Sequence, residues 1–271
     1  MRISELRSNG GIARRSLLRA GLSALLIRVA EAQKLEKPNG KKDDYLRKGD
    51  VPSYLETYRA ALGERLGKAG LERVVSSGTL REKGTDKAAV LFWELPGRFR
   101  LEKDGKAILG SGAGVTAPSA AGVSTEDDDD LVESLFLDRP ETAFYNVLAG
   151  ASVKLLGYQV GVQRGYSKSY AGPYYDVFDI EGRVGGKANS PVRSKRYVFD
   201  SMSGLLQRVT YLGGRSGLSP VVTNFGQWVR SGGENVPGLI ERRVNGESVA
   251  RFETAQSAVG AKQDDGKLDR V

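Results

Sequence analysis

Few residues in this chain of 271 residues have the chemistry of a catalytic site, because the chain contains no His and no Cys. Without His, it lacks the commonest general base and the commonest transition-metal ligand. Without Cys, it lacks disulfides, thiol nucleophiles, thiolate metal ligands and the residue that is acylated in a lipoprotein. Ser-His-Asp and Cys-His catalysis are therefore excluded. A hydrolase of this composition would depend on two facing carboxylates, as glycosidases do, and no pair of acidic residues in the sequence identifies such a site.

The densest group of candidate metal ligands is the acidic run from Glu126 to Asp130. A calcium loop of the EF-hand type would need alternating ligands, a central Gly and a distal Glu, and these are missing. Acidic residues also stabilise the N-terminus of a helix. Leu131, Leu135 and Leu137 follow at helical spacing, so the run is predicted to begin a helix, which Pro140 divides into two. We expect neither a metal nor another cofactor.

Glu94 is the acidic residue of the apolar segment 88–95. Side chains alternate between the two faces of a strand, so Glu94 shares a face with Val90, and Arg98 and Arg100 lie across the following turn. The expected arrangement is a cross-strand ion pair at the surface, which contributes less than about 1 kcal/mol. The residues with reactive side chains therefore predict a protein that is not an enzyme.

The folded part of the chain is predicted to begin with one helix. Ser53 is its predicted N-cap and begins a capping box. Tyr58 and Leu62 belong to an apolar stripe at helical spacing. The helix is predicted to end at about Gly67 or Gly70, because glycine commonly terminates helices.

Most of the remaining sequence alternates with the period of two that indicates β-strands. Turn residues separate these segments, and Asn245-Gly246 is a strong hairpin signal among them. The predicted strands are residues 73–84, 87–95, 97–103, 104–109, 153–163, 173–183, 192–200, 204–212, 219–230, 236–245 and 248–258.

These segments predict an α+β fold that is mainly antiparallel β. About ten strands joined by short turns form a strongly twisted sheet, which must curl, close or be covered. We expect a curled, half-open β-barrel over residues 51–259, with the N-terminal helix and a short helical lid over its concave face. Residues 110–130 are predicted to be a mobile low-complexity loop, and residues 260–271 a disordered tail.

The N-terminal residues predict an exported protein. Arg14 and Arg15 resemble a twin-arginine signal, and Ala30 and Ala32 form a small-residue cleavage site. The apolar segment 20–30 is shorter than the roughly 20 residues of a membrane-spanning helix. We expect a signal peptide over residues 1–32, a flexible linker over residues 33–50 and a periplasmic protein. The alternatives are export by the general secretory route and an ordinary amphipathic helix.

The net charge does not indicate a nucleic-acid partner. The whole chain carries +8, and residues 1–32 hold six Arg and two Glu, which leaves about +4 for the rest. Basic and acidic residues are mixed along the chain, so this excess is too diffuse for a nucleic-acid surface.

Three stretches of the sequence resemble the LolA, LolB and LppX family of periplasmic lipoprotein carriers. Residues 61–84 are similar to the opening helix of the family, its glycine break and its first strand. Residues 88–109 are similar to its second and third strands, with an aromatic strand, a proline turn, a Phe-Arg pair and an Asp-Gly-Lys turn. Residues 197–211 and 224–259 are similar to its C-terminal half.

The resemblance implies a half-open barrel whose apolar cavity holds acyl chains beneath a helical lid. It implies a soluble, non-catalytic periplasmic carrier for a lipid, a lipoprotein acyl chain or another hydrophobic ligand. In the lipoprotein carrier, an arginine directly before the proline of the second turn latches the lid. Leu95 precedes Pro96 here, so the arginine of this latch is missing, and the resemblance does not single out a lipoprotein among these ligands. We expect a monomer that is not an integral membrane protein.

Candidate ligand-binding residues lie on one face of the second and third strands and on the predicted helices, although the same residues would also form an ordinary core. They are Leu91, Trp93, Leu95, Phe99, Leu101, Tyr58, Leu62 and Leu135. An alternative function is a structural or interaction protein of the cell envelope, which would bind a partner at an exposed sheet edge without a ligand. The sequence specifies neither the ligand, the direction of transfer nor a partner.

Overall fold

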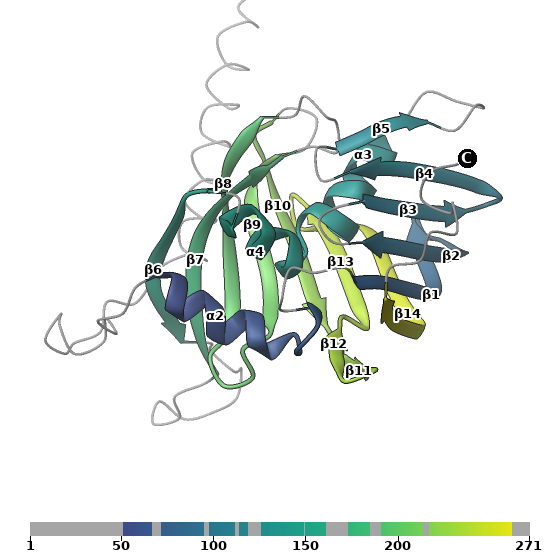
Figure 1. The fold of residues 1–271 in the computed structure, drawn as a ribbon. Helices are drawn as coiled ribbons and strands as arrows, with labels where there is room; N and C mark the ends of the chain where they lie inside the picture. The colour runs from purple at the N-terminus through teal and green to yellow at the C-terminus, as the bar shows by residue number, and fades with distance from the viewer. Residues whose placement is uncertain are drawn as a thin grey trace, which may run out of the picture. The chain divides into compact units, whose positions relative to one another are not determined.

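The computed structural model contains one large antiparallel sheet with helices on one of its faces (Figure 1). It describes residues 51–66, 72–94, 98–111, 114–118, 126–148, 150–160, 173–184, 191–213 and 217–261. All of these residues belong to one unit, Pro38–Val271. The predicted signal peptide with Arg14, Arg15, Ala30 and Ala32, the predicted linker, and Leu95 lie outside the described residues.

Twelve of the strands that the structure describes form the large sheet, in the order β5-β4-β3-β2-β1-β14-β13-β10-β9-β8-β7-β6. They are β1 (Glu72–Glu82), β2 (Thr85–Glu94), β3 (Arg98–Lys103), β4 (Lys106–Ser111), β5 (Gly114–Pro118), β6 (Val153–Val160), β7 (Tyr174–Arg183), β8 (Val192–Asp200), β9 (Leu206–Gly213), β10 (Ser219–Gly226), β13 (Leu239–Val244) and β14 (Glu247–Ala261). A separate pair consists of β11 (Val229–Ser231) and β12 (Glu234–Val236).

Two-residue turns fix the register of three hairpins. Lys83-Gly84, Asp104-Gly105 and Asn245-Gly246 each place two successive residues at positive φ, with values between 50° and 86°. This is the backbone of a type I′ turn, whose twist matches that of the paired strands. The hairpin predicted at Asn245-Gly246 is confirmed, because Val244 pairs with Glu247 across it.

The first and last strands of the sheet in chain order lie side by side in its middle. β14 pairs with β1 along its length, with Glu72 opposite Ala261 and Glu82 opposite Ala250. On its other side, β14 pairs with β13. β5 and β6 are the two edges and do not pair with each other. The predicted fold, a mainly antiparallel sheet that curls without closing, is confirmed.

The helical segments cover the concave face of the sheet (Figure 1). They are α2 (Val51–Ala61), α3 (Glu126–Val132), the π-helical turn η2 (Glu133–Leu137) and α4 (Pro140–Leu148). The break predicted at Pro140 is confirmed, since this residue begins α4, where its fixed φ and missing N–H are tolerated. We refer to α3, η2 and α4 together, residues 126–148, as the lid segment.

The N-terminal helix differs from its prediction at both ends. Ser53 lies inside α2, which already includes Val51, so the predicted N-cap is wrong. The helix ends at Ala61, earlier than predicted, because Gly63 adopts a φ of +121° that interrupts the helical backbone.

Parts of the sheet were missed in the predicted loop and tail. The predicted loop 110–130 contains β5, which pairs with β4, and also the first residues of α3. Its small residues gave no alternating pattern from which a strand could be predicted. β14 continues to Ala261, beyond the predicted domain limit at residue 259, because its last residues pair with Glu72 and Arg73 of β1.

The long strands predicted over residues 219–230 and 236–245 are both interrupted. Gln227 has a φ of 49° and ends the extended backbone of β10. Gly238 lies so close to Gln227 that a Cβ atom would be 2.2 Å from the Gln227 carbonyl oxygen. The chain therefore leaves the large sheet between β10 and β13 and forms the β11–β12 hairpin there.

Candidate functional site

Seven of the eight predicted ligand-binding residues are described, and all seven are buried between the sheet and the helices. They are Tyr58 and Leu62 of α2, Leu135 of η2, and Leu91, Trp93, Phe99 and Leu101 of β2 and β3. All seven belong to one cluster of buried apolar side chains. The structure therefore brings them together as core residues, and their role as ligand lining stays a prediction.

Helix α2 packs on the part of the sheet formed by β7 and β8. The ring centre of Tyr58 lies 5.4 Å from that of Phe178, edge to face, and 4.8 Å from that of Phe199. Such aromatic pairs contribute about 0.5–1.5 kcal/mol beyond the area that they bury. The hydroxyl of Tyr58 donates a hydrogen bond to Asp176 of β7. The contact of α2 with the sheet is thus apolar inside and polar at its margin.

The lid segment packs on β2 and β3. Phe136 stacks on Phe99 with ring centres 4.3 Å apart. The guanidinium of Arg139 lies 5.0 Å from the centre of the Trp93 ring, and it pairs with Glu141 at 3.0 Å. A desolvated cation over an indole ring contributes about 2 kcal/mol. Trp93, predicted as ligand lining, therefore contacts a buried charged residue of the lid segment.

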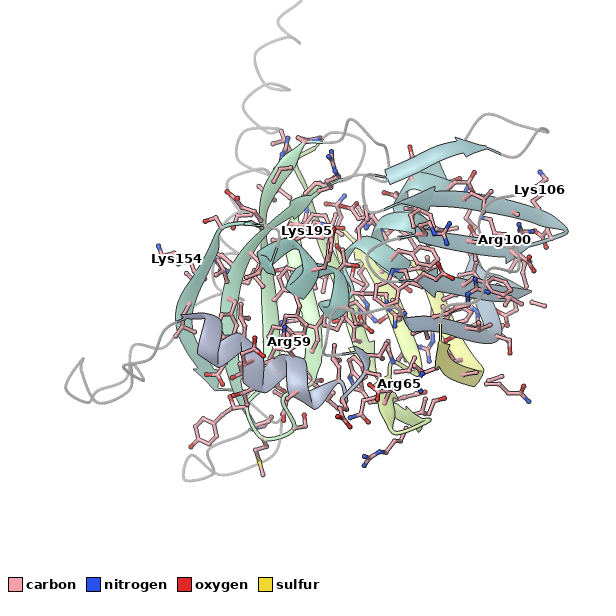
Figure 2. The ribbon with its side chains drawn as sticks, in the orientation of Figure 1. Arg59, Arg65, Arg100, Lys106, Lys154 and Lys195 are labelled. Atoms are coloured by element: carbon pink, nitrogen blue, oxygen red, sulfur yellow. The ribbon has the colours of Figure 1, made fainter. Side chains whose placement is uncertain are left out.

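A group of charged side chains lies beneath the lid segment on the same face of the sheet. We call it the buried ion network, and its members are Lys195 of β8, Arg242 of β13, and Asp130, Glu133 and Asp138 of the lid segment. Figure 2 shows Lys195 beside the short helices. The cations thus belong to the sheet and the carboxylates to the segment that covers it.

Lys195 is fully buried at one end of this network. Its Nζ donates hydrogen bonds to Asp138 Oδ1 at 2.6 Å and to Glu133 Oε1 at 3.3 Å. The same Nζ lies 4.5 Å from the centre of the Tyr211 ring. Asp138 also accepts hydrogen bonds from the hydroxyls of Tyr211 at 3.1 Å and Thr223 at 2.6 Å. One lid carboxylate therefore binds three strands of the sheet, β8, β9 and β10.

Arg242 is buried at the other end of the network. Its Nη2 donates to Asp130 Oδ1 at 2.8 Å and to Glu133 Oε2 at 3.2 Å, and its Nη1 donates to the Tyr211 hydroxyl at 2.8 Å. Its Nε is buried and has no hydrogen-bond partner among the residues that the structure describes. Burial raises the pKa of Asp130, and Arg242 opposes that shift.

Burial and the charges of the network also shift the pKa values of two tyrosines. Burial raises the pKa of Tyr211 and Tyr197 well above the usual value for a phenol, and the charges of Asp138 and Glu133 raise it further. Both side chains therefore remain neutral at physiological pH. Paired charges in a protein interior recover their desolvation cost only with good geometry, whereas removal of one partner is strongly destabilising. The network consequently favours one position of the lid segment over the sheet.

The buried ion network was not predicted, although strand alternation contains a signal for its two cations. Lys195 is in phase with the buried residues Tyr197 and Phe199, and Arg242 is in phase with the buried residue Ile240. A charged residue at an apolar position of an alternating strand requires a partner from the element that covers it. The carboxylate partners could not be identified, because they are more than 50 residues away in the sequence.

A second polar attachment holds the end of α2. The carboxylate of Glu234 on β12 accepts hydrogen bonds from the backbone N–H groups of Arg65 and Leu66, the latter at 2.8 Å. Asn235 donates from its backbone to Leu62 O at 2.7 Å and from its side chain to Ala61 O at 2.8 Å. Figure 2 shows Arg65 next to this hairpin. Asn235 thus caps carbonyl groups at the end of α2, and Glu234 holds the turn that follows the helix.

Glu94 is not the surface residue that the sequence predicts. Its side chain is fully buried, pairs with Arg98 at 2.8 Å as expected, and accepts a further hydrogen bond from Arg73 Nε at 2.7 Å. Arg73 was missed because it lies on β1, directly opposite Glu94 in the register of β1 and β2. Glu94 points to the face of β2 opposite that of Trp93, so it takes no part in the candidate site.

An open pocket of about 600 Å³ lies over β1, β2, β3 and β4. Its lining combines small residues such as Gly78 and Ala88 with charged ones such as Arg100, Glu102 and Lys106. None of the seven described ligand-binding candidates lines it. The predicted site therefore corresponds to the covered concave face and not to this pocket.

No helix among the described residues is long and apolar enough to span a membrane. The sequence matches no protein-family model and no curated protein sequence. Its fold matches solved structures, among them a LolA superfamily protein from Nitrosomonas europaea, at 12% identity and a TM-score of 0.50, over 80% of this chain and 97% of that one. Another is described as an outer membrane lipoprotein-sorting protein domain from Vibrio parahaemolyticus, at 10% identity and a TM-score of 0.51, over 80% of this chain and 95% of that one.

At these identities the comparison concerns the fold alone. The match extends over nearly the full length of both solved chains. It agrees with the open antiparallel sheet and the helices on its concave face. The chain therefore has the fold of the LolA superfamily, as the resemblance of its sequence predicts.

Proposed function

We propose that this protein is a non-catalytic carrier that binds a lipid, an acyl chain or another hydrophobic ligand between the concave face of its sheet and its helices. The observation that supports this proposal best is the way in which the helices are attached to that face. A broad apolar surface on an open sheet is covered by short helices, which are attached to it by buried ion pairs as well as by apolar contacts. If this cover moves away from the sheet, it exposes an apolar concave face of the kind that binds hydrophobic ligands.

The buried ion network would hold the lid segment closed in the absence of ligand. In the related carriers an arginine before the proline of the second turn has this role, and here Leu95 occupies that position. Lys195 and Arg242 bind the lid segment from β8 and β13 instead. The fold of a lipoprotein-sorting domain supports the same function, although the cargo of this protein need not be a lipoprotein.

This function can be tested on protein that is purified without detergent from an export-competent bacterium. We expect organic extraction and mass spectrometry to recover lipid in a fixed ratio to protein, and the stripped protein to bind the neutral dye Nile red. The absence of both lipid and dye binding would reject the carrier and favour an envelope protein that uses the same sheet without a ligand.

We also propose that the chain acts in the periplasm after removal of residues 1–32. The support is the order of Arg14, Arg15 and the Ala30 and Ala32 cleavage site in the sequence. N-terminal sequencing of exported protein should begin at Gln33. A start at Met1 would reject the signal peptide.

A further inference from the structure

A ligand that displaces the lid segment would meet two cations on the sheet that have lost their carboxylate partners. Lys195 and Arg242 project from the sheet, and their carboxylate partners all belong to the lid segment. When the lid segment moves away, its three carboxylates leave with it. Two cations and the hydroxyls of Tyr211 and Thr223 then remain on the floor of the exposed site.

A purely apolar ligand would bury these cations without a counter-charge. An unpaired charge beneath hydrocarbon is much less favourable than a hydrogen-bonded ion pair. A ligand with its own acidic group would replace the lost carboxylates. The chemistry of the floor therefore discriminates against neutral lipids.

The Glu133 carboxylate shows where such an acidic group would bind. Its two oxygens contact both cations at once, Lys195 Nζ at 3.3 Å and Arg242 Nη2 at 3.2 Å. The two side chains thus converge on a single acid, although they originate on strands β8 and β13. Arg242 Nε is a further buried donor without a partner among the described residues, so the floor can donate more hydrogen bonds than the lid accepts.

Apolar surface for the rest of the ligand lies on both sides of this position. On one side are Phe178 and Phe199 beneath α2, and on the other are Trp93 and Phe99 beneath the lid segment. We propose that the ligand of this carrier is an anionic amphiphile, whose carboxylate or phosphate replaces Glu133 and Asp138 on Lys195 and Arg242 while its hydrocarbon occupies the apolar surface. This inference rests on the proposed carrier function.

Displacement of Nile red from the purified full chain tests the inference with ligands of equal chain length. Dodecanoate and dodecyl phosphate should displace the dye at concentrations about tenfold or more below that of dodecanol, because only the anions compensate the two cations. The anion that displaces the dye at the lower concentration shows whether the site prefers a carboxylate or a phosphate headgroup. Equal displacement by dodecanol would overturn the inference while leaving the carrier function intact, whereas absence of dye binding would reject the carrier itself. Displacement by inorganic phosphate alone would also overturn the inference, since it would show an anion site that needs no hydrocarbon.

Two variants on opposite sides of the network separate a ligand-binding role from a structural one. Lys195→Met should reduce the preference for dodecanoate over dodecanol to about twofold or less. Glu133→Gln should instead increase dodecanoate affinity, because it removes a competing carboxylate and leaves both cations in place. If Glu133→Gln folds and loses dodecanoate binding, or if both variants keep the wild-type preference, the inference is wrong. The Glu133→Gln result decides the question even if Lys195→Met does not fold.

Discussion

At the scale of single residues, the network under the lid segment concentrates the polar chemistry of the interior. Lys195 is completely buried, and both of its carboxylate partners are buried as well. If one member of the network is removed, another charge stays buried without a partner, and this strongly destabilises the fold. This property makes the network both an attachment for the lid segment and a sensitive position for mutation.

Replacement of Lys195 by Met should lower the free energy of unfolding by about 3–5 kcal/mol, since it leaves Asp138 buried without its cation. The matched control is Arg81→Met, which removes a pair with Asp86 of the same 2.6 Å length between two exposed side chains. Urea unfolding should show a large loss for the first variant and almost none for the second. Equal losses would show that the buried pair does not hold the lid segment to the sheet.

The buried phenol of Tyr197 predicts a dependence of stability on alkaline pH. Its pKa in the folded protein is raised above the usual 10.0 by burial and then by Asp138 and Glu133. A raised folded pKa means that this contribution to stability is fully present below about pH 10 and is lost as the pH rises further, because only the unfolded chain ionises there. Tyr197→Phe should therefore reduce the loss of unfolding free energy between about pH 9 and pH 11. Identical pH profiles for the variant and the wild type would contradict the assignment.

Residue roles could be predicted from the sequence only where a local pattern determines them. Strand alternation correctly assigned Leu91, Trp93 and Leu101 to the interior. The same alternation places Lys195 and Arg242 at apolar positions, but it cannot supply partners that are distant in the sequence. The two cations of the network were thus present in the sequence pattern, and their three carboxylate partners required the fold.

At the scale of elements, the end of α2 depends on one glycine. Gly63 has a φ of +121°, and a Cβ atom there would lie 2.3 Å from Glu234 Oε2, the carboxylate that holds the turn after the helix. Gly157 of β6 has nearly the same φ, +122°, but a Cβ atom added to it would meet no other atom of the described residues within 4 Å. The two glycines therefore separate backbone strain from loss of the Glu234 contacts.

Gly63→Ala should destabilise the protein more than Gly157→Ala. Backbone strain at this positive φ costs about 1–3 kcal/mol in both variants, and displacement of the Glu234 carboxylate adds to it only in the first. Hydrogen exchange should become faster in α2 for Gly63→Ala and remain unchanged there for Gly157→Ala. Unchanged exchange in α2 of the Gly63 variant would show that Glu234 does not hold the helix.

The elements themselves were largely predictable, because strands and two-residue turns have local signatures. The type I′ turn at Asn245-Gly246 and the helix start at Pro140 follow from residue chemistry alone. β5 and the β11–β12 hairpin were not predictable from alternation. The first consists of small residues, and the second forms where Gln227 and Gly238 approach each other through their backbones.

At the scale of the whole molecule, the pairing of β1 with β14 joins two series of hairpins into one open sheet. This contact connects residues about as far apart as the described chain allows, so no local sequence pattern predicts it. The resemblance to lipoprotein carriers implied the correct type of fold, and the register followed only from the structure. The open sheet leaves a concave face that helices must cover, and this cover is the basis of the proposed function.

The measurement that tests the central claim most directly is ligand uptake with the lid segment tethered to the sheet. Lys83, at the β1–β2 turn, pairs with Asp127 of α3 at 2.6 Å, and both side chains are exposed. The natural chain has no Cys, so a thiol-cleavable bismaleimide would link only the two residues of a Lys83→Cys/Asp127→Cys variant. Lys83→Cys alone, treated with the same reagent, is the control.

We expect the tethered protein to lose Nile red and dodecanoate uptake and to regain both when the tether is cleaved, while the control binds throughout. Undiminished uptake by the tethered protein would contradict a binding site beneath the lid segment.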